Sequence, residues 1–173
     1  MEHLKYPIGK FRKPENIDTA TIKQWIKEIE DFPAALEALT KGLTNEQLQL
    51  RYRPGGWTIS QVVHHCADSH INSIIRFKLA LTEDAPTIRP YFEDRWAELP
   101  DGSDAHIADS MAMLKGVHRR WARLLHSLND EQLNRTFTHP EHGKSFSLKE
   151  NIGIYAWHGQ HHLGHVRLAL GGG

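Results

Sequence analysis

Apolar residues recur every three or four positions in four long segments of the chain, which is the spacing of amphipathic helices. The segments cover about residues 18–42, 58–83 and 104–127, and a fourth begins after Ser147. Only residues 137–146 suggest a turn or a short hairpin. The apolar positions of the first segment include Ile22, Trp25, Ile26, Ile29, Phe32, Leu36 and Leu39. We therefore expect an all-α fold, a four-helix bundle with long loops between the helices.

Capping residues and one proline refine these boundaries. Thr58 with Gln61 and Ser147 with Glu150 match the capping box, in which two side chains satisfy free backbone N–H groups at the start of a helix. Pro33 lies inside the first segment, where it should kink or split the helix.

The segments between the helices differ in character. Residues 1–17 are rich in proline and glycine and predict an ordered arm or a loose terminus. Residues 84–103 predict a long connection whose aromatic side chains can wall a pocket. The six residues at 43–48 recur almost unchanged at 128–133, in each case shortly before a histidine-bearing helix. This repeat suggests two related halves and a bundle with approximate twofold symmetry.

Composition narrows the classes of function. The 173 residues fit one domain spanning 1–173, and the 21 basic and 21 acidic side chains give a formal net charge of zero. No broad positive field is available for nucleic acid or an anionic membrane, so we expect neither as a partner. A single cysteine and the lack of a signal segment or a membrane-length apolar run predict a cytoplasmic protein.

The fourth predicted helix carries a stripe of histidines. His158, His161, His162 and His165 fall within an arc of roughly 100° on a helical wheel. A pair at positions i and i+4 can share one divalent ion. Because the chain has 13 histidines, a coincidental pair is the alternative, with imidazoles that merely hydrogen-bond in the core.

The second predicted helix offers a third ligand. Gln61, His65, Asp68 and Asn72 cluster in a sector of about 60°, and apolar residues cover most of the remainder. The sector is either a solvent face or, since it holds no Lys, Arg or Glu, an interior polar face. On the second interpretation His65 is a metal ligand. Asp68 and Gln61 then become candidates to orient a ligating imidazole, with Asp68 the best acid/base candidate by position. Cys66 is expected to be a small buried hydrophobe rather than a ligand.

Several motifs resemble one known family. The chain is similar throughout to the YfiT branch of the DinB-like superfamily, a resemblance that implies a four-helix bundle, a homodimer and one divalent metal ion per subunit. When the motifs of the family are matched to this sequence, the resemblance implies that His65, His158 and His162 are the three metal ligands. It implies that His161 is not a ligand. At His165 many DinB-like proteins have glutamine, so a fourth imidazole could crowd or tune the site. The motifs are Tyr6-Pro7-Ile8-Gly9, Gly55-Gly56-Trp57-Thr58, Gln61-Val62-Val63-His64-His65, Ala67-Asp68-Ser69-His70, and Tyr155-Ala156-Trp157-His158 with His161-His162.

Three neutral imidazoles leave positions open on zinc or nickel, as in a catalytic site. The resemblance suggests a metal-dependent hydrolase or a thiol S-transferase of the bacillithiol transferase type. We favour activation of a low-molecular-weight thiol for transfer to an electrophile in detoxification. Hydrolysis by metal-bound hydroxide is one alternative. A metal- or ligand-binding protein without turnover is another.

Overall fold

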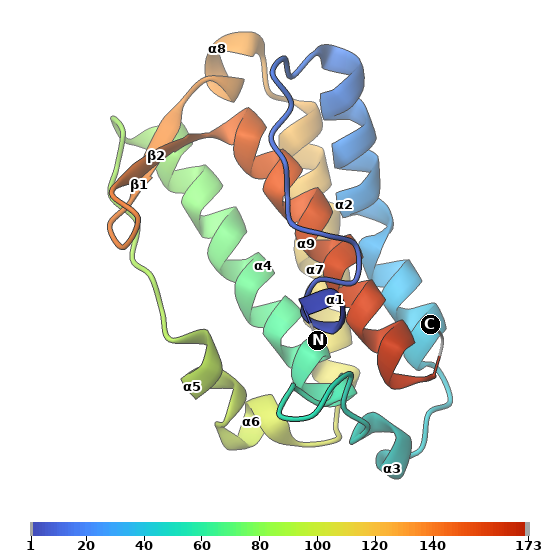
Figure 1. Cartoon of the computed structure of the whole chain (residues 1–173). Helices are drawn as coiled ribbons and strands as arrows, with labels where there is room; N and C mark the ends of the chain where they lie inside the picture. Colours follow the sequence, from blue (N-terminus) through green and yellow to red (C-terminus); the bar gives the residue numbers. More distant parts are fainter. Residues whose placement is uncertain (1, 172–173) are drawn as a thin grey trace.

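Four long helices form the body of the molecule in the computed structural model, which describes residues 2–171 (Figure 1). Each long helix packs against two others: α2 against α7 and α9, and α4 against the same two. As a result, α2 and α4 occupy one diagonal of the bundle, and α7 and α9 the other. The expected all-α four-helix bundle is confirmed. The four helices are α2 (Thr19–Thr40), α4 (Ile59–Thr82), α7 (Ala108–His126) and α9 (Leu148–Ala169).

Short elements connect these helices. The predicted hairpin is present, with β1 and β2 antiparallel and Thr136 paired with Ser147. The connection at 84–103 contains two short helices, and the third long helix begins at Ala108 instead of near residue 104. Within residues 2–171, no helix is both long enough and apolar enough to cross a membrane. The short elements are α1 (Glu2–Lys5), α3 (Asn45–Leu48), α5 (Glu93–Ala97), α6 (Pro100–Ser103), α8 (Asp130–Leu133), β1 (Thr136–His139) and β2 (Lys144–Ser147).

The two predicted capping boxes have different outcomes. At α4 the Thr58 hydroxyl accepts from the Gln61 N–H at 3.1 Å, and the Gln61 side chain accepts from the Thr58 N–H at 3.0 Å. At α9 the Ser147 hydroxyl accepts from the Glu150 N–H at 3.2 Å. The Glu150 carboxylate does not complete that box, because it pairs with Lys13 and Lys144.

The six-residue sequence repeat corresponds to a repeated structure. Both copies form a one-turn helix with a complete capping box, α3 and α8. Each is followed by a backbone hydrogen bond that closes onto the next long helix. The N–H of Ile59 donates to the Leu50 carbonyl at 3.0 Å, and the N–H of Leu148 donates to the Arg135 carbonyl at 2.9 Å. The two halves therefore place α4 and α9 as equivalent, adjacent helices.

Pro33 does not split the first long helix. The α2 helix runs unbroken from Thr19 to Thr40 with Pro33 buried inside it, so the expectation of a split is wrong. A proline has no N–H, and in a helix that N–H would have donated to the carbonyl four residues earlier. The carbonyl of Ile29 is thus left without its helical donor. Surrounding packing against α7 and α9 keeps the helix intact.

The N-terminal arm is ordered and lies along α9 (Figure 1). Lys13 pairs with Glu150 at 3.2 Å, and the Trp157 indole N–H donates to the Gly9 carbonyl at 3.0 Å. Near the end of α9, Gly164 lets Pro7 approach so closely that an added Cβ would lie 2.8 Å from the proline ring. Of the two alternatives for the N-terminal segment, the ordered arm is the observed one for residues 2–17, and residue 1 lies outside the described residues.

Glycines on α9 allow its close approach to α2. A Cβ added at Gly159 would lie 2.9 Å from Cδ2 of Phe32, a core residue with 1% exposure. Gly116, in the middle of α7, has no neighbouring atom within 4 Å of the same position. Alanine substitutions at these two positions therefore separate the effect of packing on stability from the effect of helix propensity.

We expect Gly159→Ala to destabilise the protein by about 1–3 kcal/mol, because the methyl group must displace Phe32 in a packed core. The matched variant Gly116→Ala should stabilise it by about 0.5–1 kcal/mol through helix propensity alone. Urea unfolding followed by circular dichroism measures both. Equal effects of the two substitutions would contradict the packing argument.

Candidate metal centre

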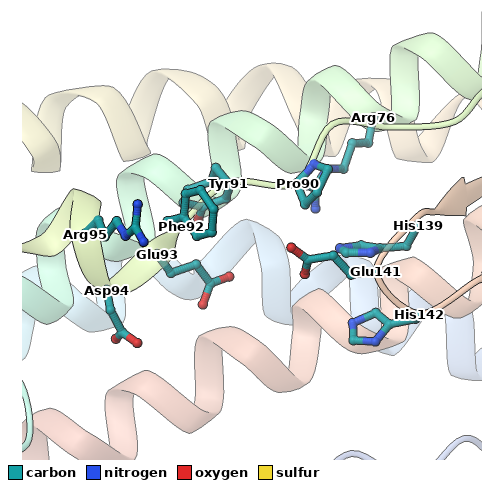
Figure 2. A pocket seen from close by; sticks show the side chains of 10 residues that line it. All are labelled: Arg76, Pro90, Tyr91, Phe92, Glu93, Asp94, Arg95, His139, Glu141 and His142. Carbon is teal, nitrogen blue, oxygen red and sulfur yellow. The ribbon is translucent and has the colours of Figure 1, made fainter.

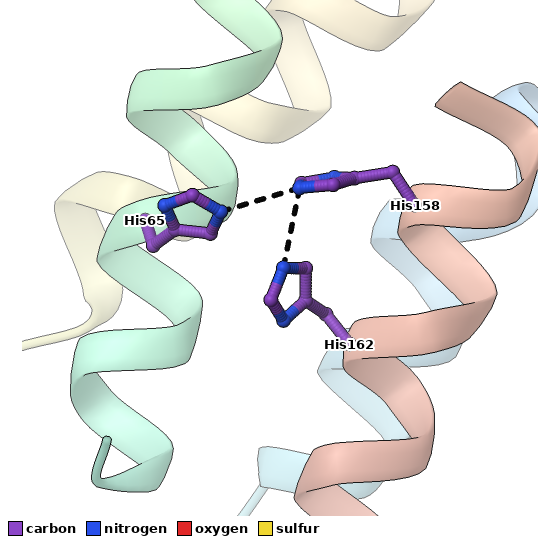
Figure 3. A group of neighbouring side chains, drawn as sticks. All are labelled: His65, His158 and His162. Atoms are coloured by element: carbon purple, nitrogen blue, oxygen red, sulfur yellow. Dashed lines mark hydrogen bonds between the residues drawn. The ribbon is translucent and has the colours of Figure 1, made fainter. Parts of the chain in front are cut away.

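Three histidines from two facing helices converge at the middle of the bundle (Figure 3). His65 projects from α4, and His158 and His162 project from successive turns of α9. The Nε2 atom of His158 lies 3.2 Å from the Nε2 atom of His65 and 3.2 Å from that of His162. The sequence analysis selected these three residues, and the structure brings them together.

Backbone carbonyls determine which nitrogen of each α9 imidazole carries the proton. A carbonyl can only accept, so His118 Nδ1 donates to the free Ile29 carbonyl, and His118 Nε2 is left as an acceptor. His70 Nδ1 then donates to His118 Nε2 at 2.7 Å. In turn His158 Nδ1 donates to His70 Nε2 at 3.0 Å. We call this chain from His158 to Ile29 the long relay; it leaves the Nε2 of His158 with a bare lone pair.

A second, shorter relay acts on His162. His165 Nε2 donates to the Lys5 carbonyl at 3.0 Å, in the last residue of α1, so its Nδ1 must accept. His162 Nδ1 donates to that atom at 3.2 Å. The Nε2 of His162 therefore also presents a bare lone pair, directed at His158.

Both deductions require neutral rings, and burial provides that condition. Burial lowers the pKa of His118 to about 4, and it is also the main cause that lowers the pKa of His70 and His165. The pKa values of His158 and His162 are held well below the usual value, first by burial and then by neighbouring imidazoles. At neutral pH all five rings are uncharged.

The resulting arrangement fits a divalent metal ion. Two lone pairs that face each other at 3.2 Å repel unless a cation lies between them. Bonds of about 2.0–2.1 Å in a tetrahedral site place neighbouring nitrogen ligands about 3.3 Å apart, close to the observed separations. His65 completes the set, and burial followed by His161 and His165 lowers its pKa to about 3. It is positioned by packing, with its ring 4.6 Å from that of Trp57.

His161 and His165 form a second group with His162 that shares a ligand with the first. Their donor atoms lie within 4.8 Å of one another. However, His165 already uses both nitrogens in the short relay. His161 stacks on Trp157 at 4.5 Å, and its buried Nδ1 has no hydrogen-bond partner among the described residues. The group is therefore not an independent centre.

Gln61 and Asp68, the candidate orienting residues, lie elsewhere. The amide of Gln61 is used by the α4 cap and by the Ala97 carbonyl at 2.9 Å. Asp68 is half-buried, and its pKa is raised by burial and then by Asp101. In the part of the chain that the structure describes, neither side chain hydrogen-bonds to the three converging histidines. The expected orienting role is therefore not observed: local capping takes up the amide of Gln61, and the relays take up the N–H groups of His158 and His162.

The sequence analysis missed His70 and His118. One signal was available in the sequence: a proline inside a helix frees a carbonyl four residues earlier. Which donor reaches that carbonyl depends on how α2 packs against α7, and this packing cannot be read from the sequence. Cys66 is fully buried in the apolar core, as expected.

The pocket in front of the three histidines has a volume of about 380 Å³. Aromatic rings form much of its wall, and its two carboxylates are Glu93 and Asp94, at the start of α5. Glu93 keeps access to solvent through the pocket. Its pKa is nevertheless raised by burial and then by Asp94. The aromatic wall residues are Tyr6, Tyr52, Trp57 and Trp157.

Comparison with known proteins identifies the family. The model of the DinB superfamily matches residues 28–166, and the chain belongs to that superfamily. Relatives from Bacillus cereus and Bacillus thuringiensis, each 53% identical over 96% of this chain and 95% of their own, bear the name "Putative metal-dependent hydrolase". The solved structure of YfiT from Bacillus subtilis is similar with a TM-score of 0.94 at 45% identity, covering 96% of this chain and 95% of that one. That protein is described as a probable metal-dependent hydrolase with an unusual four-helix bundle topology.

The long relay makes a prediction about metal affinity. In His118→Phe the Nδ1 of His70 loses its acceptor, so His70 can carry its proton on Nε2 instead. That N–H then donates to Nδ1 of His158, and the proton of His158 moves to Nε2, where it blocks the metal-binding lone pair. We expect affinity for Zn²⁺ or Ni²⁺ to fall about 10–100-fold, as for other orienting partners of metal ligands. Competition with a chromophoric chelator measures the affinity.

Nitrogen-15 NMR of the metal-free protein reports the same effect without any metal. Wild type should show His158 protonated at Nδ1, and His118→Phe should show a mixture. The control His126→Phe changes an exposed histidine of the same helix and should match wild type. An unchanged tautomer and affinity in His118→Phe would refute the relay.

A further prediction concerns acid. His65, His70, His118 and His162 are buried, and their pKa values are lowered from the ordinary 6.5. Below pH 6.5 the unfolded chain therefore binds more protons than the folded one, and stability falls as pH falls. Each ring contributes about 1.4 kcal/mol per pH unit. From pH 6.5 to pH 5 the four rings together cost about 8 kcal/mol, which is comparable to a typical total stability of about 5–15 kcal/mol, so the metal-free protein should lose most of its stability by roughly pH 5.

Urea titrations of metal-free protein at a series of pH values test this expectation. Stability should be constant near neutral pH and decline below pH 6.5. A flat profile between neutral pH and roughly pH 5 would mean that the buried rings accept protons in the folded state, and the deduced tautomers would then fail.

Proposed function

We propose that this protein is a metal-dependent hydrolase with one divalent ion, zinc or nickel, held by His65, His158 and His162. The observation that carries the proposal is the pair of facing lone pairs on His158 and His162, whose direction is fixed by two backbone carbonyls. An ion bound there would supply Lewis acidity and lower the pKa of a nucleophile in its open position.

The protein's own residues support hydrolysis in two ways. Glu93 lines the same pocket as the histidines, and the raised pKa of its carboxyl makes it a stronger base than an ordinary glutamate. It takes the acid/base role for which the sequence suggested Asp68. The names of the relatives point to the same class of reaction.

A second candidate is the transfer of a low-molecular-weight thiol to an electrophile. The aromatic wall formed by Tyr6, Tyr52, Trp57 and Trp157 favours it, because such a wall can stack on an apolar or haloaromatic electrophile. This reaction needs no carboxylate base, since a thiol loses its proton more readily than water. The thiol, the electrophile, a cytoplasmic location and a homodimer are proposals that rest on the sequence; sedimentation velocity tests the dimer.

One experiment separates these possibilities. We expect wild type to retain one zinc or nickel ion after dialysis, and His65→Ala to lose it together with at least about 100-fold of the activity. His161→Ala removes a neighbouring imidazole that is not a ligand, and it should keep the ion. Metal analysis, a panel of ester and amide substrates, and conjugation of thiols including bacillithiol to chlorodinitrobenzene provide the measurements.

Each outcome has a distinct meaning. Metal-dependent cleavage of esters or amides supports the hydrolase. Conjugation without cleavage replaces it with the transferase, and retained metal without either reaction replaces it with a binding protein. Loss of the ion in His161→Ala but not in His65→Ala would overturn the ligand set.

A further inference from the structure

A second pocket, of about 460 Å³, lies between the start of α5 and the turn of the β1–β2 hairpin (Figure 2). Its lining carries charges of both signs: arginines from α4 and α5, and carboxylates from α5 and the hairpin turn. Figure 2 shows Glu93, Glu141 and His142 directed into the same space. The pocket is therefore polar, in contrast to the aromatic wall in front of the histidines.

This second pocket adjoins the histidine pocket. Glu93 and Asp94 line both of them, so the two spaces meet at the first turn of α5. A molecule that reaches the three histidines can thus extend past these two carboxylates toward the hairpin. The second pocket is placed to hold a part of the substrate that does not react.

The charges of the second pocket are available for a ligand. Among residues 2–171, no ion pair within 4.0 Å involves Arg76, Arg95, Glu93 or Glu141. Arg76 spends one N–H on the Arg89 carbonyl at 3.2 Å, which leaves the rest of its guanidinium free. Charges that are not paired within the protein can be satisfied by complementary groups on a ligand.

A buried polar atom in the lining lacks a partner as well. The Nδ1 of His139 makes no hydrogen bond within the described residues. Burial of a polar atom without a partner is costly, so such atoms mark places where a ligand or water is bound. Metal is not the ligand that fits, because the pocket's histidines and carboxylates do not converge to coordination distance within residues 2–171.

We propose that the second pocket binds the zwitterionic end of the substrate, with a carboxylate at Arg76 and an ammonium group at Glu141. The substrate class is then an amino-acid-like or short peptide-like compound whose reacting group extends to the histidines. The reaction of the group that extends to the histidines rests on the proposed function, whereas the binding of the zwitterionic end does not. It applies equally to a hydrolysable compound and to a thiol.

Binding without turnover tests the proposal. The probe is S-methylglutathione, which carries one ammonium group and two carboxylates. The matched probe is its N-acetyl dimethyl ester, which has the same backbone without the charges. Calorimetry and NMR of the histidine side chains are done on both metal-free and metal-loaded protein. We expect the charged probe to shift His139 and His142 and to bind at least about tenfold more tightly than the neutral one.

Charge-removing variants locate the site. Arg76→Gln and Glu141→Gln should each weaken the charged probe about tenfold or more and leave the neutral probe unaffected. Arg123→Gln on α7 and Glu131→Gln on α8 remove exposed charges outside the pocket and should match wild type. Equal binding of the two probes, or equal effects of the pocket variants and these controls, would overturn the proposal.

The result is independent of the proposed reaction. If the charged probe binds at Arg76 and Glu141 but no hydrolysis or conjugation is found, the subsite stands and the proposed function fails. If the reaction is found but charge on the probe makes no difference, the function stands and the subsite fails.

Discussion

One missing hydrogen bond in α2 fixes the orientation of the His158 ring on α9. Pro33 leaves the Ile29 carbonyl without a helical donor, and His118 satisfies that carbonyl from α7. Everything that follows along the long relay is forced, because each neutral imidazole has one N–H and one lone pair. The covalent structure of a proline thus determines which nitrogen of His158 has a free lone pair, through contacts that involve all four long helices.

The short relay uses the same device at a helix end. The last carbonyls of a helix have no intrahelical donor, and Lys5 is the last residue of α1. His165 donates to that carbonyl, which ties the N-terminal arm to the metal centre. The arm therefore covers α9 and also orients His162 through His165. Close packing maintains the long relay: Phe32 lies against the rings of His70 and His118, at 5.1 and 5.4 Å, and Gly159 makes room for it.

Much of this fold is encoded locally, and that part could be predicted. Apolar periodicity gave the four helices, the Thr58 cap gave the start of α4, and facing sectors on two helices gave the three converging histidines. Residues that act through tertiary contacts escaped the same reasoning. His70 is five positions after His65 and on a different part of its helix, yet α9 crosses where its ring can meet His158. A helical wheel shows which residues share a face of one helix, but it does not show where a second helix crosses that face.

The abundance of buried imidazoles has a single explanation in donors and acceptors. A chain of neutral imidazoles that starts by donating to a carbonyl must end in one unshared lone pair, whatever its length. Two such chains end at the same point here, at His158 and His162, and no internal donor can satisfy both ends. His65 could offer at most one proton, which leaves one lone pair unmet. Burial opposes filling the gap with an extra proton, because it lowers the pKa values of all three rings. A divalent cation would satisfy the three nitrogens at once, and the hydrogen-bond directions favour that arrangement.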